Sequence, residues 1–371
     1  MNFETNEEID GVRDSLIRVL SDHYTSSHRQ ALADSGTAYA EQAWKEMTGL
    51  GLTGLLVPQD FDGLGRDFTD LLPVFLELGR SLAPVPFMSS CVLGATALRR
   101  ADNTELQKML MPSLVAGTLQ LSCSHTSAST IPSVSAQWHD GAWRLAGVQQ
   151  HLPYAATADR LILAARVSGS ASEQDGLYIL AREAVGVRLR SHRLIDGTPA
   201  ADVYLDDAEA IALCAPGSVQ ARTAIEAVAA AGIAAACAEM VGIMEAAFRL
   251  TVDYLKTRQQ FGRLIGENQA LRHRSADMLV ALETARSLSI AAALAAGHGG
   301  SGTAESRADL HRAKFLVGRN ARILCQAAIQ LHGGIGMTEE YKVGHYLRRV
   351  HVLDHQFGNE AQHLQELAKL T

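Results

Sequence analysis

The chain has 371 residues, of which 47% are hydrophobic and 20% are charged, and its formal net charge is −7. This composition is typical of a globular protein with two or three packed units, and the acidic balance excludes the basic surface of a nucleic-acid-binding domain. The polar N-terminal segment predicts no signal peptide, and the apolar run at 227–238 is shorter than the roughly 20 residues of a membrane span. Five scattered cysteines without a CxxC pair predict buried free thiols in a reducing cytoplasm.

Residues 1–116 are predicted to be helical. The segment "DFTDLLPVFLELG" has an acidic start and apolar residues near helical spacing, so we expect a helix that stops at Gly79. The preceding stretch "VPQDFDGLGR" is rich in Pro, Asp and Gly and predicts a loop. The first part of the chain is therefore expected to be an α-helical domain.

Residues 117–216 change to short runs of alternating polarity. The segment "SAQWHDGAWRLAG" predicts a hairpin that turns at Asp140-Gly141. The segments "RLILAARV", "GLYILAREA" and "ADVYLDD" predict further strands. We expect a small β domain here.

Residues 217–371 are predicted to be helical again. An Ala-rich helix is expected over 221–257, and its apolar character on most faces places it at the centre of a bundle. Further helices are expected at 267–296 and 304–331, the second ending at a Gly-Gly pair. A last helix begins near Asn359, where Gln362 completes a capping box.

Two stretches in this last part carry residues suited to a flat and anionic ligand. In "RQQFGRLIGENQ", Arg258 offers a planar fork for phosphate oxygens, Phe261 an aromatic face, and Gln260 and Gln269 both donors and acceptors. In "QLHGGIGM", which begins at Gln330, three glycines let the backbone approach a ligand closely. Taken singly, the two stretches are equally consistent with a helix corner and a glycine cap.

Together and in this order, the two stretches resemble signatures of the acyl-CoA dehydrogenase family. "RQQFGRLIGENQA" is similar to R-x-x-F-G-x-x-[LI]-x-x-x-Q, and "QLHGGIGMTEEY" is similar to Q-x-x-G-G-x-G-[FM]. "VPQDFDGLG" is similar to the family's V-P-x-x-x-G-G-x-G, with Asp62 in place of one glycine. The resemblance covers essentially the whole chain. It implies a mainly α fold with an N-terminal helical domain (1–116), a β-barrel or sandwich domain (117–216) and a C-terminal four-helix bundle (217–371).

The resemblance also implies FAD shared across a subunit interface, an acyl-CoA substrate oxidised to the 2,3-enoyl-CoA, and an electron acceptor such as electron-transfer flavoprotein. Carried over residue by residue, it places Arg258 on the pyrophosphate of FAD. The other residues that it assigns to the ADP half of FAD are Gln260, Phe261, Ile265, Gln269, Gln330, Gly333 and Gly334.

The family needs a carboxylate base, and this chain has none where the resemblance places it. Most members carry a Glu in a YEGT-like segment before the last helix. Here "HQFGNEAQHL" puts Phe357 or Gly358 at that position. Other members carry the Glu in the first bundle helix, where the count from Arg258 reaches Gly232-Ile233. We therefore expect no catalytic residue at either family position.

Three acids lie near the two vacant positions. Glu226 and Glu239 are each about two helical turns from Gly232, and we interpret them as surface or interface charges. Glu360 follows the lost position by three residues, in the first turn of a helix, where the helix dipole favours any carboxylate. Glu360 is therefore a weak candidate for a displaced base.

The middle domain also departs from the family pattern. The usual T-E-P-x-x-G-S segment is "CSHTSAST" here, and the Trp-Ile-[ST] beside the flavin ring corresponds to His151-Leu152-Pro153. Proline supplies neither a hydroxyl nor a backbone N–H. The ADP-binding half of the site is thus retained, whereas the half for the reactive ring is not.

This asymmetry resembles the base-less subunit of α2β2 acyl-CoA dehydrogenases, known from bacterial degradation of steroid and bile-acid side chains. The resemblance implies a homologous partner that carries the Glu, a bulky steroid-like acyl-CoA substrate, and no activity for this chain alone. Two alternatives remain: a self-sufficient homo-oligomeric enzyme that uses Glu360, and a flavin-free structural homologue.

Histidines provide one further hypothesis. "EAQH", from Glu360 to His363, matches the Glu-x-x-His of di-iron bundles. Such sites need a second pair, which the sequence lacks, so no metal site is predicted. Four other histidines are candidates for positions near the cofactor: His125, His151, His332 and His355.

Overall fold

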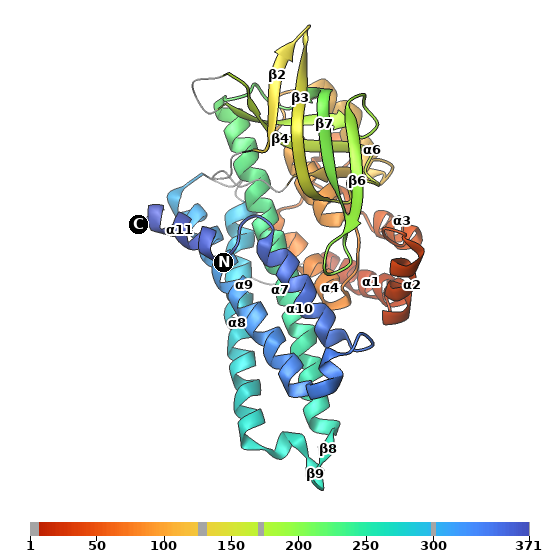
Figure 1. The fold of residues 1–371 in the computed structure, drawn as a ribbon, viewed down its shortest axis with the longest axis vertical. Coiled ribbons are helices and arrows are strands. Elements are labelled where there is room, and N and C mark those ends of the chain that lie inside the picture. Colours follow the sequence, from red (N-terminus) through yellow and green to blue (C-terminus); the bar gives the residue numbers. More distant parts are fainter. Residues whose placement is uncertain (1–6, 125–131, 170–173, 298–301, 371) are drawn as a thin grey trace.

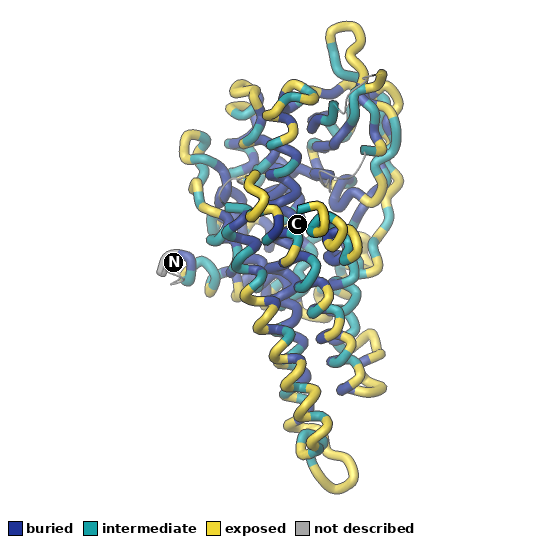
Figure 2. The backbone as a smooth tube through the Cα atoms, turned by 90° about the vertical axis from the view of Figure 1, so that its left-hand side faces the viewer, coloured by how far each residue is buried: buried dark blue, intermediate teal, exposed yellow. Residues whose placement is uncertain are grey.

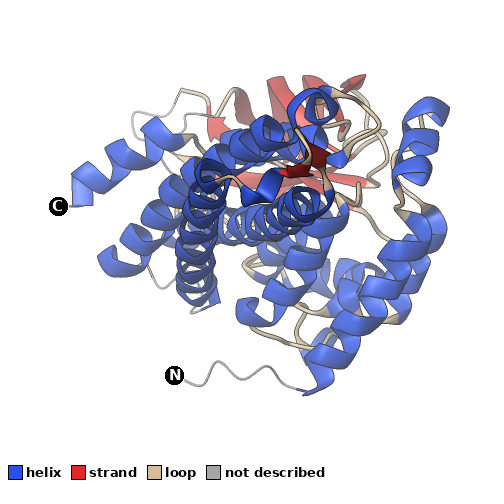
Figure 3. Cartoon of the chain, turned by 90° about the horizontal axis from the view of Figure 1, so that it is seen from below, coloured by secondary structure: helices blue, strands red, loops and turns tan. Residues whose placement is uncertain are grey.

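The computed structural model describes residues 7–124, 132–169, 174–297 and 302–370. Figure 1 shows a β-barrel beside the upper end of a long helical bundle, with the N-terminal helices packed against their junction. Viewed from below, the bundle helices run side by side in front of the strands (Figure 3). This arrangement confirms the predicted fold class, mainly helical with a β region in the middle of the chain.

The elements follow in chain order. The N-terminal helices are α1 (Glu7–His23), α2 (Ser26–Ser35), α3 (Glu41–Gly49), α4 (Leu72–Ser81), α5 (Ala95–Arg99) and α6 (Thr104–Val115). The strands are β1 (Leu121–Cys123), β2 (Val134–His139), β3 (Ala142–Pro153), β4 (Arg160–Val167), β5 (Asp175–Ala181), β6 (Val187–Arg193) and β7 (Pro199–Ala212). The C-terminal elements are α7 (Val219–Thr257), β8 (Gln259–Gln260), β9 (Arg263–Leu264), α8 (Gln269–Gly297), α9 (Ala304–His332), α10 (Lys342–His355) and α11 (Glu360–Leu370).

The helix that was predicted to stop at Gly79 continues to Ser81 as α4. Gly79 is buried where α4 crosses α7, and a Cβ atom there would collide with the backbone carbonyl of Glu239. Gly242 of α7 meets the backbone of Leu76 in the same way. The prediction of a stop was wrong because this glycine allows two helices to pack closely.

The loop at 57–66 forms as predicted, and it explains the departure at Asp62. This residue has a φ of 64°, the left-handed conformation that glycine adopts most readily. Aspartate is one of the few other residues that occupy this region without a large steric penalty. The replacement of a family glycine by Asp62 therefore preserves the shape of the loop.

The middle region is a closed barrel. In the part of the chain that the structure describes, seven strands form one sheet in the order β1-β4-β2-β3-β7-β5, with β6 paired to β7. Because β5 also pairs with β4, the ring closes and leaves few free strand edges. Asp140 and Gly141 turn the β2–β3 hairpin with φ values of 50° and 81°, as a type I′ turn requires. The predicted hairpin is confirmed.

The bundle is built around α7. The hydroxyl of Ser218 accepts the N–H of Ala221 (3.0 Å) and starts a helix of 39 residues. It packs against α4, α8, α9 and α10. The last helix has the predicted capping box, in which Asn359 and Gln362 exchange hydrogen bonds of 2.9 and 3.1 Å.

Helix α10 was not predicted, although its sequence carries the signal. Its buried residues are Val343, Tyr346, Val350, Leu353 and Asp354. The apolar ones recur at helical spacing, and the strongly charged segment between them masks the pattern. This helix leads directly into the segment where the family carries its base.

Two helices, α7 and α8, are long and apolar enough to cross a membrane by length and composition. The sequence predicts both helices, but the only apolar run compared with a membrane span was the shorter one at 227–238. The apolar window of α7 is completely buried inside the protein, whereas only 39% of that of α8 is buried. Helix α7 is thus a core helix, and α8 presents apolar surface.

A buried ion-pair network joins the barrel to the bundle. Arg349 of α10 donates to Glu239 of α7 (2.6 Å) and to Asp196 in the loop after β6 (2.9 Å). Glu239 is 4% exposed, so of the two roles expected of it, a surface or an interface charge, the surface role is excluded. Its pairing with Arg349 offsets the cost of burying the carboxylate and places it at a domain junction.

All five cysteines are free and buried, as predicted. Burial raises the pKa of the Cys91, Cys123, Cys237 and Cys325 thiols well above the usual range. Thiols in this state are unreactive. The cysteines are therefore packing residues of the core and not candidates for a reactive site.

Candidate functional site

The two stretches that carry the predicted FAD-binding residues lie together at the end of the bundle remote from the barrel (Figure 1). In the first, Phe261 (φ 54°) and Gly262 (φ 79°) form the type I′ turn of the β8–β9 hairpin. The second stretch begins at the end of α9. The ring of Tyr254, in the last turn of α7, stacks on His332 at the end of α9 with 4.5 Å between centroids. Tertiary packing thus joins two segments that are about 70 residues apart in the sequence.

The predicted side chains in these stretches are exposed and unengaged. Phe261 is 99% exposed, and Figure 2 shows most of the tip of the bundle as exposed. The side chains of Arg258, Gln260, Gln269 and Gln330 make no hydrogen bond or ion pair to any residue that the structure describes. They are therefore free to bind a ligand, a second chain or both.

Their geometry fits the ADP half of FAD. Ile265 donates its N–H to the carbonyl of Arg258 (3.0 Å) and closes the base of the hairpin. Gln269 opens α8, and helix N-termini favour phosphate groups. Gly333 and Gly334 border open space, so a planar group can reach their backbone. This chain offers an open face at these positions.

The two positions at which the family carries its base coincide in space, and an apolar ring occupies them. Phe357 is 3% exposed, and its ring lies directly against Gly232 of α7, where an added Cβ would collide with it. Phe357 (φ 62°) and Gly358 (φ 103°) form the tight turn between α10 and α11. Neither side chain can take up a proton.

Phe357 also lies on the wall between two cavities. The smaller, of about 430 Å³, lies between α7, α9 and α11 and is lined by Ala229 and Ile233. The larger, of about 860 Å³, lies between α10 and the barrel and is lined by His151 and His355. The buried ring thus separates the two cavities.

A buried lysine holds this turn in place. Lys314 of α9 is 1% exposed, and its Nζ donates to the carbonyls of Asp354 (2.8 Å) and Gly358 (2.9 Å). Burial lowers the pKa of Lys314 to about 8. The sequence analysis missed this residue, which is visible in the sequence only as a charge on an otherwise apolar face of α9.

Glu360, the candidate displaced base, is engaged elsewhere. Its carboxylate accepts a hydrogen bond from Arg322 (2.5 Å), which also binds Asp354 (3.1 Å). Glu360 is not among the residues that line either cavity. Glu226 does line the smaller cavity, at its edge. The geometry therefore favours a structural role for Glu360.

The histidines that were considered as neighbours of the cofactor do not all lie together in the described part of the structure. His151 and His355 share the larger cavity, whereas His332 lies at the opposite end of the bundle. His125 lies outside the described residues, as does most of the segment that replaces T-E-P-x-x-G-S. Pro153 is buried in the barrel wall. The barrel side of the cavity therefore presents an imidazole where the family pattern has an aromatic residue.

The Glu-x-x-His pair does not form the metal site considered above. Glu360 binds Arg322, and His363 Nδ1 lies 2.8 Å from the Nδ1 of His311. Burial, with the nearby Lys314 and His311, lowers the pKa of His363 to about 3. His363 thus pairs with His311, whereas Glu360 turns to Arg322.

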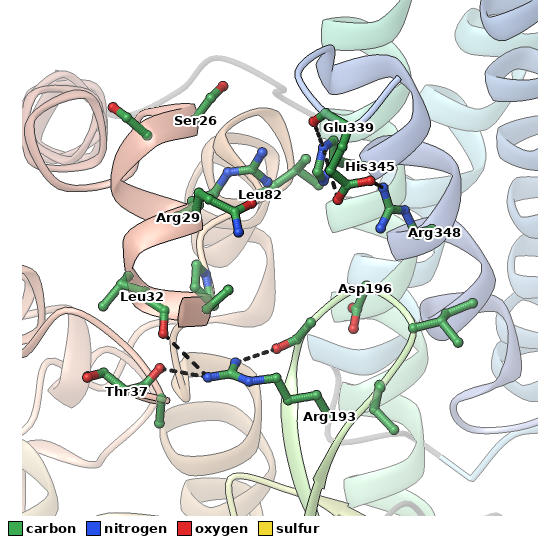
Figure 4. A pocket seen from close by; sticks show the side chains of 18 of the residues that line it. Ser26, Arg29, Leu32, Thr37, Leu82, Arg193, Asp196, Glu339, His345 and Arg348 are labelled. Atoms are coloured by element: carbon green, nitrogen blue, oxygen red, sulfur yellow. Dashed lines mark hydrogen bonds and ion pairs between the residues drawn. The ribbon is translucent and has the colours of Figure 1, made fainter. Parts of the chain in front are cut away.

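A third cavity, of about 730 Å³, lies between α2, the loop after β6 and the start of α10 (Figure 4). Its arginines are largely engaged by the protein. Arg193 donates to the carbonyls of Leu32, Thr37 and Gly197, and Arg348 pairs with Glu339 (2.5 Å). The Arg193 bonds join the barrel to the N-terminal helices, whereas the Arg348–Glu339 pair lies within the C-terminal part. Because residues of all three parts line this cavity, we interpret it as a junction.

The comparison with protein families identifies the chain. The model of the "Acyl-CoA dehydrogenase, C-terminal domain" matches residues 222–370, and that of the "Acyl-CoA dehydrogenase, N-terminal domain" matches residues 6–118. The chain belongs to the acyl-CoA dehydrogenase family. The predicted family and its fold are thereby confirmed.

Individual members of the acyl-CoA dehydrogenase family are similar over almost the full length. The acyl-CoA dehydrogenase IpdE2 of Mycobacterium tuberculosis is 27% identical over 93% of this chain and 91% of its own. A variant of the Tcur3481-Tcur3483 steroid ACAD is 26% identical, with a TM-score of 0.88 over 98% of this chain and 97% of that chain. The ChsE4-ChsE5 complex of Mycobacterium tuberculosis, at 22% identity, has a TM-score of 0.87 over 100% of this chain and 98% of that chain, and shows the fold.

Proposed function

We propose that this chain is the non-catalytic subunit of a heterotetrameric, FAD-dependent acyl-CoA dehydrogenase. The observation that carries the proposal is the contrast between its two sites. The residues that the resemblance assigns to the ADP half of FAD are present, and their polar side chains are unengaged, whereas Phe357 fills the position assigned to the base and packs against Gly232. Such a chain completes the FAD site of a homologous partner and leaves the chemistry to that partner.

In this proposal the residues at the bundle tip hold the ADP half of FAD across the subunit interface. Arg258 binds the pyrophosphate through a charge-assisted hydrogen bond, and Phe261 supplies an exposed aromatic surface. The remaining proposed contacts are Gln260, Ile265, Gln269, Gln330, Gly333 and Gly334. FAD, when bound, supplies a hydride acceptor for the α,β-dehydrogenation of an acyl-CoA to its 2,3-enoyl-CoA. The partner supplies the carboxylate for the α-proton.

Exposed apolar surface on α8 supports association with another chain. Only 39% of the apolar window of this helix is buried, and Leu279 and Val280 are 43% and 67% exposed. Exposed apolar side chains flanked by polar and charged residues are a feature of protein interfaces. Helix α8 follows directly from the β8–β9 hairpin, so a partner that covers it also reaches the proposed FAD contacts.

The proposed substrate is a bulky, steroid-like acyl-CoA, in the cytoplasm, with a partner such as electron-transfer flavoprotein as electron acceptor. This assignment rests on the relatives, since one of them is a steroid ACAD of two named chains. The two cavities of about 430 and 860 Å³ on either side of Phe357 are consistent with a fold that gives space to a large ring system.

The test is the flavin content of the purified chain, alone and co-expressed with a homologous chain that carries the glutamate. We expect little flavin and no acyl-CoA oxidation from the chain alone, and one FAD per heterodimer in the complex. One FAD per chain without a partner, with activity that disappears in Glu360→Gln, would instead establish the self-sufficient enzyme. A complex that forms without flavin would establish the structural homologue.

A further inference from the structure

Three potential metal ligands lie close together on the barrel, and two of them, His151 and His192, line the larger cavity. They are His151 on β3, His192 on β6 and Asp202 on β7, and their ligand atoms all lie within 4.8 Å of one another. His151 Nδ1 is 2.9 Å from His192 Nε2 and 3.8 Å from the Oδ1 of Asp202. Ligands at zinc distance in a tetrahedron are about 3.3 Å apart, so small side-chain movements accommodate an ion.

The backbone is shaped to place these groups on one face of the sheet. His192 and Asp202 share a face because His192 pairs with Ala200, two residues from Asp202. In β3, the pairing with β7 shifts between Gln149 and Leu152, which forms a bulge that contains His151. A bulge redirects a side chain to the other face of its strand. His151 also has a φ of 52°, a strained conformation for this residue.

The surrounding bonds prepare each group for coordination. His192 Nδ1 donates to the carbonyl of Arg190 (3.4 Å), which leaves the lone pair of Nε2 directed at His151. A bond from the second ring nitrogen to a carbonyl is the usual support of a metal-ligating histidine. Asp202 accepts the backbone N–H of His151 (3.0 Å), and the structure describes no lysine or arginine paired with its carboxylate. Its charge is therefore available to a cation.

From this geometry we propose that His151, His192 and Asp202 form a site for a borderline divalent metal ion of the Zn²⁺ class. Two imidazoles and a carboxylate are a ligand set typical of zinc with one open position. The open position faces the cavity of about 860 Å³, which His351 and His355 of α10 line from the opposite side. The ion replaces the proton that the two histidines share in the metal-free protein.

The site is independent of the proposed role at the bundle tip. None of its ligands belongs to the residues proposed to bind FAD, and metal binding can be measured without flavin, substrate or partner. The sequence analysis predicted no metal site, because the three ligands are distributed over about 50 residues with no motif. Only the pairing of β3 and β6 with the same strand brings them together.

The experiment titrates Zn²⁺ into the full chain, freed of any affinity tag, in competition with a chromophoric chelator. We expect one equivalent to bind, and Co²⁺ to give the visible absorption of a tetrahedral complex. His192→Gln should weaken binding roughly tenfold or more, since it removes a direct ligand. Asp202→Asn should weaken it similarly while keeping an oxygen for the N–H of His151. Circular dichroism and the melting temperature establish that both variants are folded.

The matched control is His139→Gln. His139 is an exposed histidine on the same barrel with a carboxylate, Asp140, 3.2 Å away but no third ligand. Its replacement should leave the Zn²⁺ affinity unchanged. Absence of a stoichiometric site in the wild-type chain would overturn the proposal, as would equal affinity in the wild type and in a folded variant with both His192→Gln and Asp202→Asn. Neither result would change the flavin content expected of the heterodimer.

Discussion

At position 357 a phenylalanine stands where the resemblance to the family pattern places the carboxylate base, and its neighbours pack closely around it. Residue 232 is a glycine, and any other residue type at this position would place a Cβ atom in collision with the ring. The Nζ of Lys314 donates a hydrogen bond to the carbonyl of Gly358, which fixes the turn that contains Phe357. A single substitution back to glutamate would leave a buried carboxylate against an apolar helix face, which is costly.

Replacement of this side chain should therefore lower stability. Phe357→Ala removes a buried ring, and we expect the free energy of unfolding to fall by about 3–5 kcal/mol. The matched control is Phe261→Ala, because Phe261 is 99% exposed, and surface changes usually remain within about 0.5 kcal/mol. Urea denaturation followed by circular dichroism measures both. Equal losses in the two variants would contradict the packing described for Phe357.

Arg258 gives the corresponding prediction for the cofactor. Arg258→Ala should weaken the retention of FAD by the co-expressed complex about 10- to 100-fold, since a hydrogen bond to a charged group contributes roughly 1.5–3 kcal/mol. The control is Arg222→Ala, an exposed arginine near the opposite end of the same helix. Flavin fluorescence released after extensive dialysis is the readout. Undiminished flavin in Arg258→Ala would remove this residue from the site.

At the scale of the elements, the contact between α11 and α9 makes the stability of the protein depend on pH. His363 is 3% exposed and lies against His311. Its pKa of about 3 in the folded protein is lowered by burial first, and then by Lys314 and His311. Between this value and the ordinary pKa of about 6.5 the unfolded chain binds a proton that the folded chain does not. Stability from this group is therefore present above pH 6.5 and is lost as the pH falls toward 3.

His363→Gln should remove this part of the pH dependence. In the wild type, one proton changes the free energy of unfolding by about 1.4 kcal/mol per pH unit within the window. The variant should have a slope smaller by nearly that amount, measured by urea unfolding at a series of pH values. His273→Gln serves as the control, because this histidine is exposed on α8. An unchanged slope in His363→Gln would mean that His363 is protonated in the folded protein.

Helix boundaries were predictable where local chemistry decides them. The cap of Ser218 and the capping box at Asn359 form as their residue types indicate. The end of α4 was not predictable, because Gly79 serves a crossing with α7 that no local pattern contains. Local rules fail at such positions because long-range packing overrides the intrinsic preference of one residue.

At the scale of the whole molecule, the apolar face of α8 predicts assembly. Val280→Asp places a charge on this face, and we expect the heterotetramer to dissociate at micromolar concentration because the interface would have to bury that charge. Light scattering after size-exclusion chromatography measures the mass. The control is Val185→Asp, because Val185 is 92% exposed on the barrel. Dissociation in both variants, or in neither, would place the interface elsewhere.

The sequence by itself determined the order of helices, barrel and bundle, the family, and the absence of an acid at the two family positions of the base. Each of these follows from periodicity, turn chemistry or residue type at a fixed place in the chain. The tertiary structure decided which distant residues meet. It brought Phe357 onto Gly232, placed the hairpin after α7 beside the end of α9, and joined three ligands on neighbouring strands. Such contacts depend on strand register and on the angles at which helices cross. Both are set by the packing of the whole chain and cannot be read from a local segment.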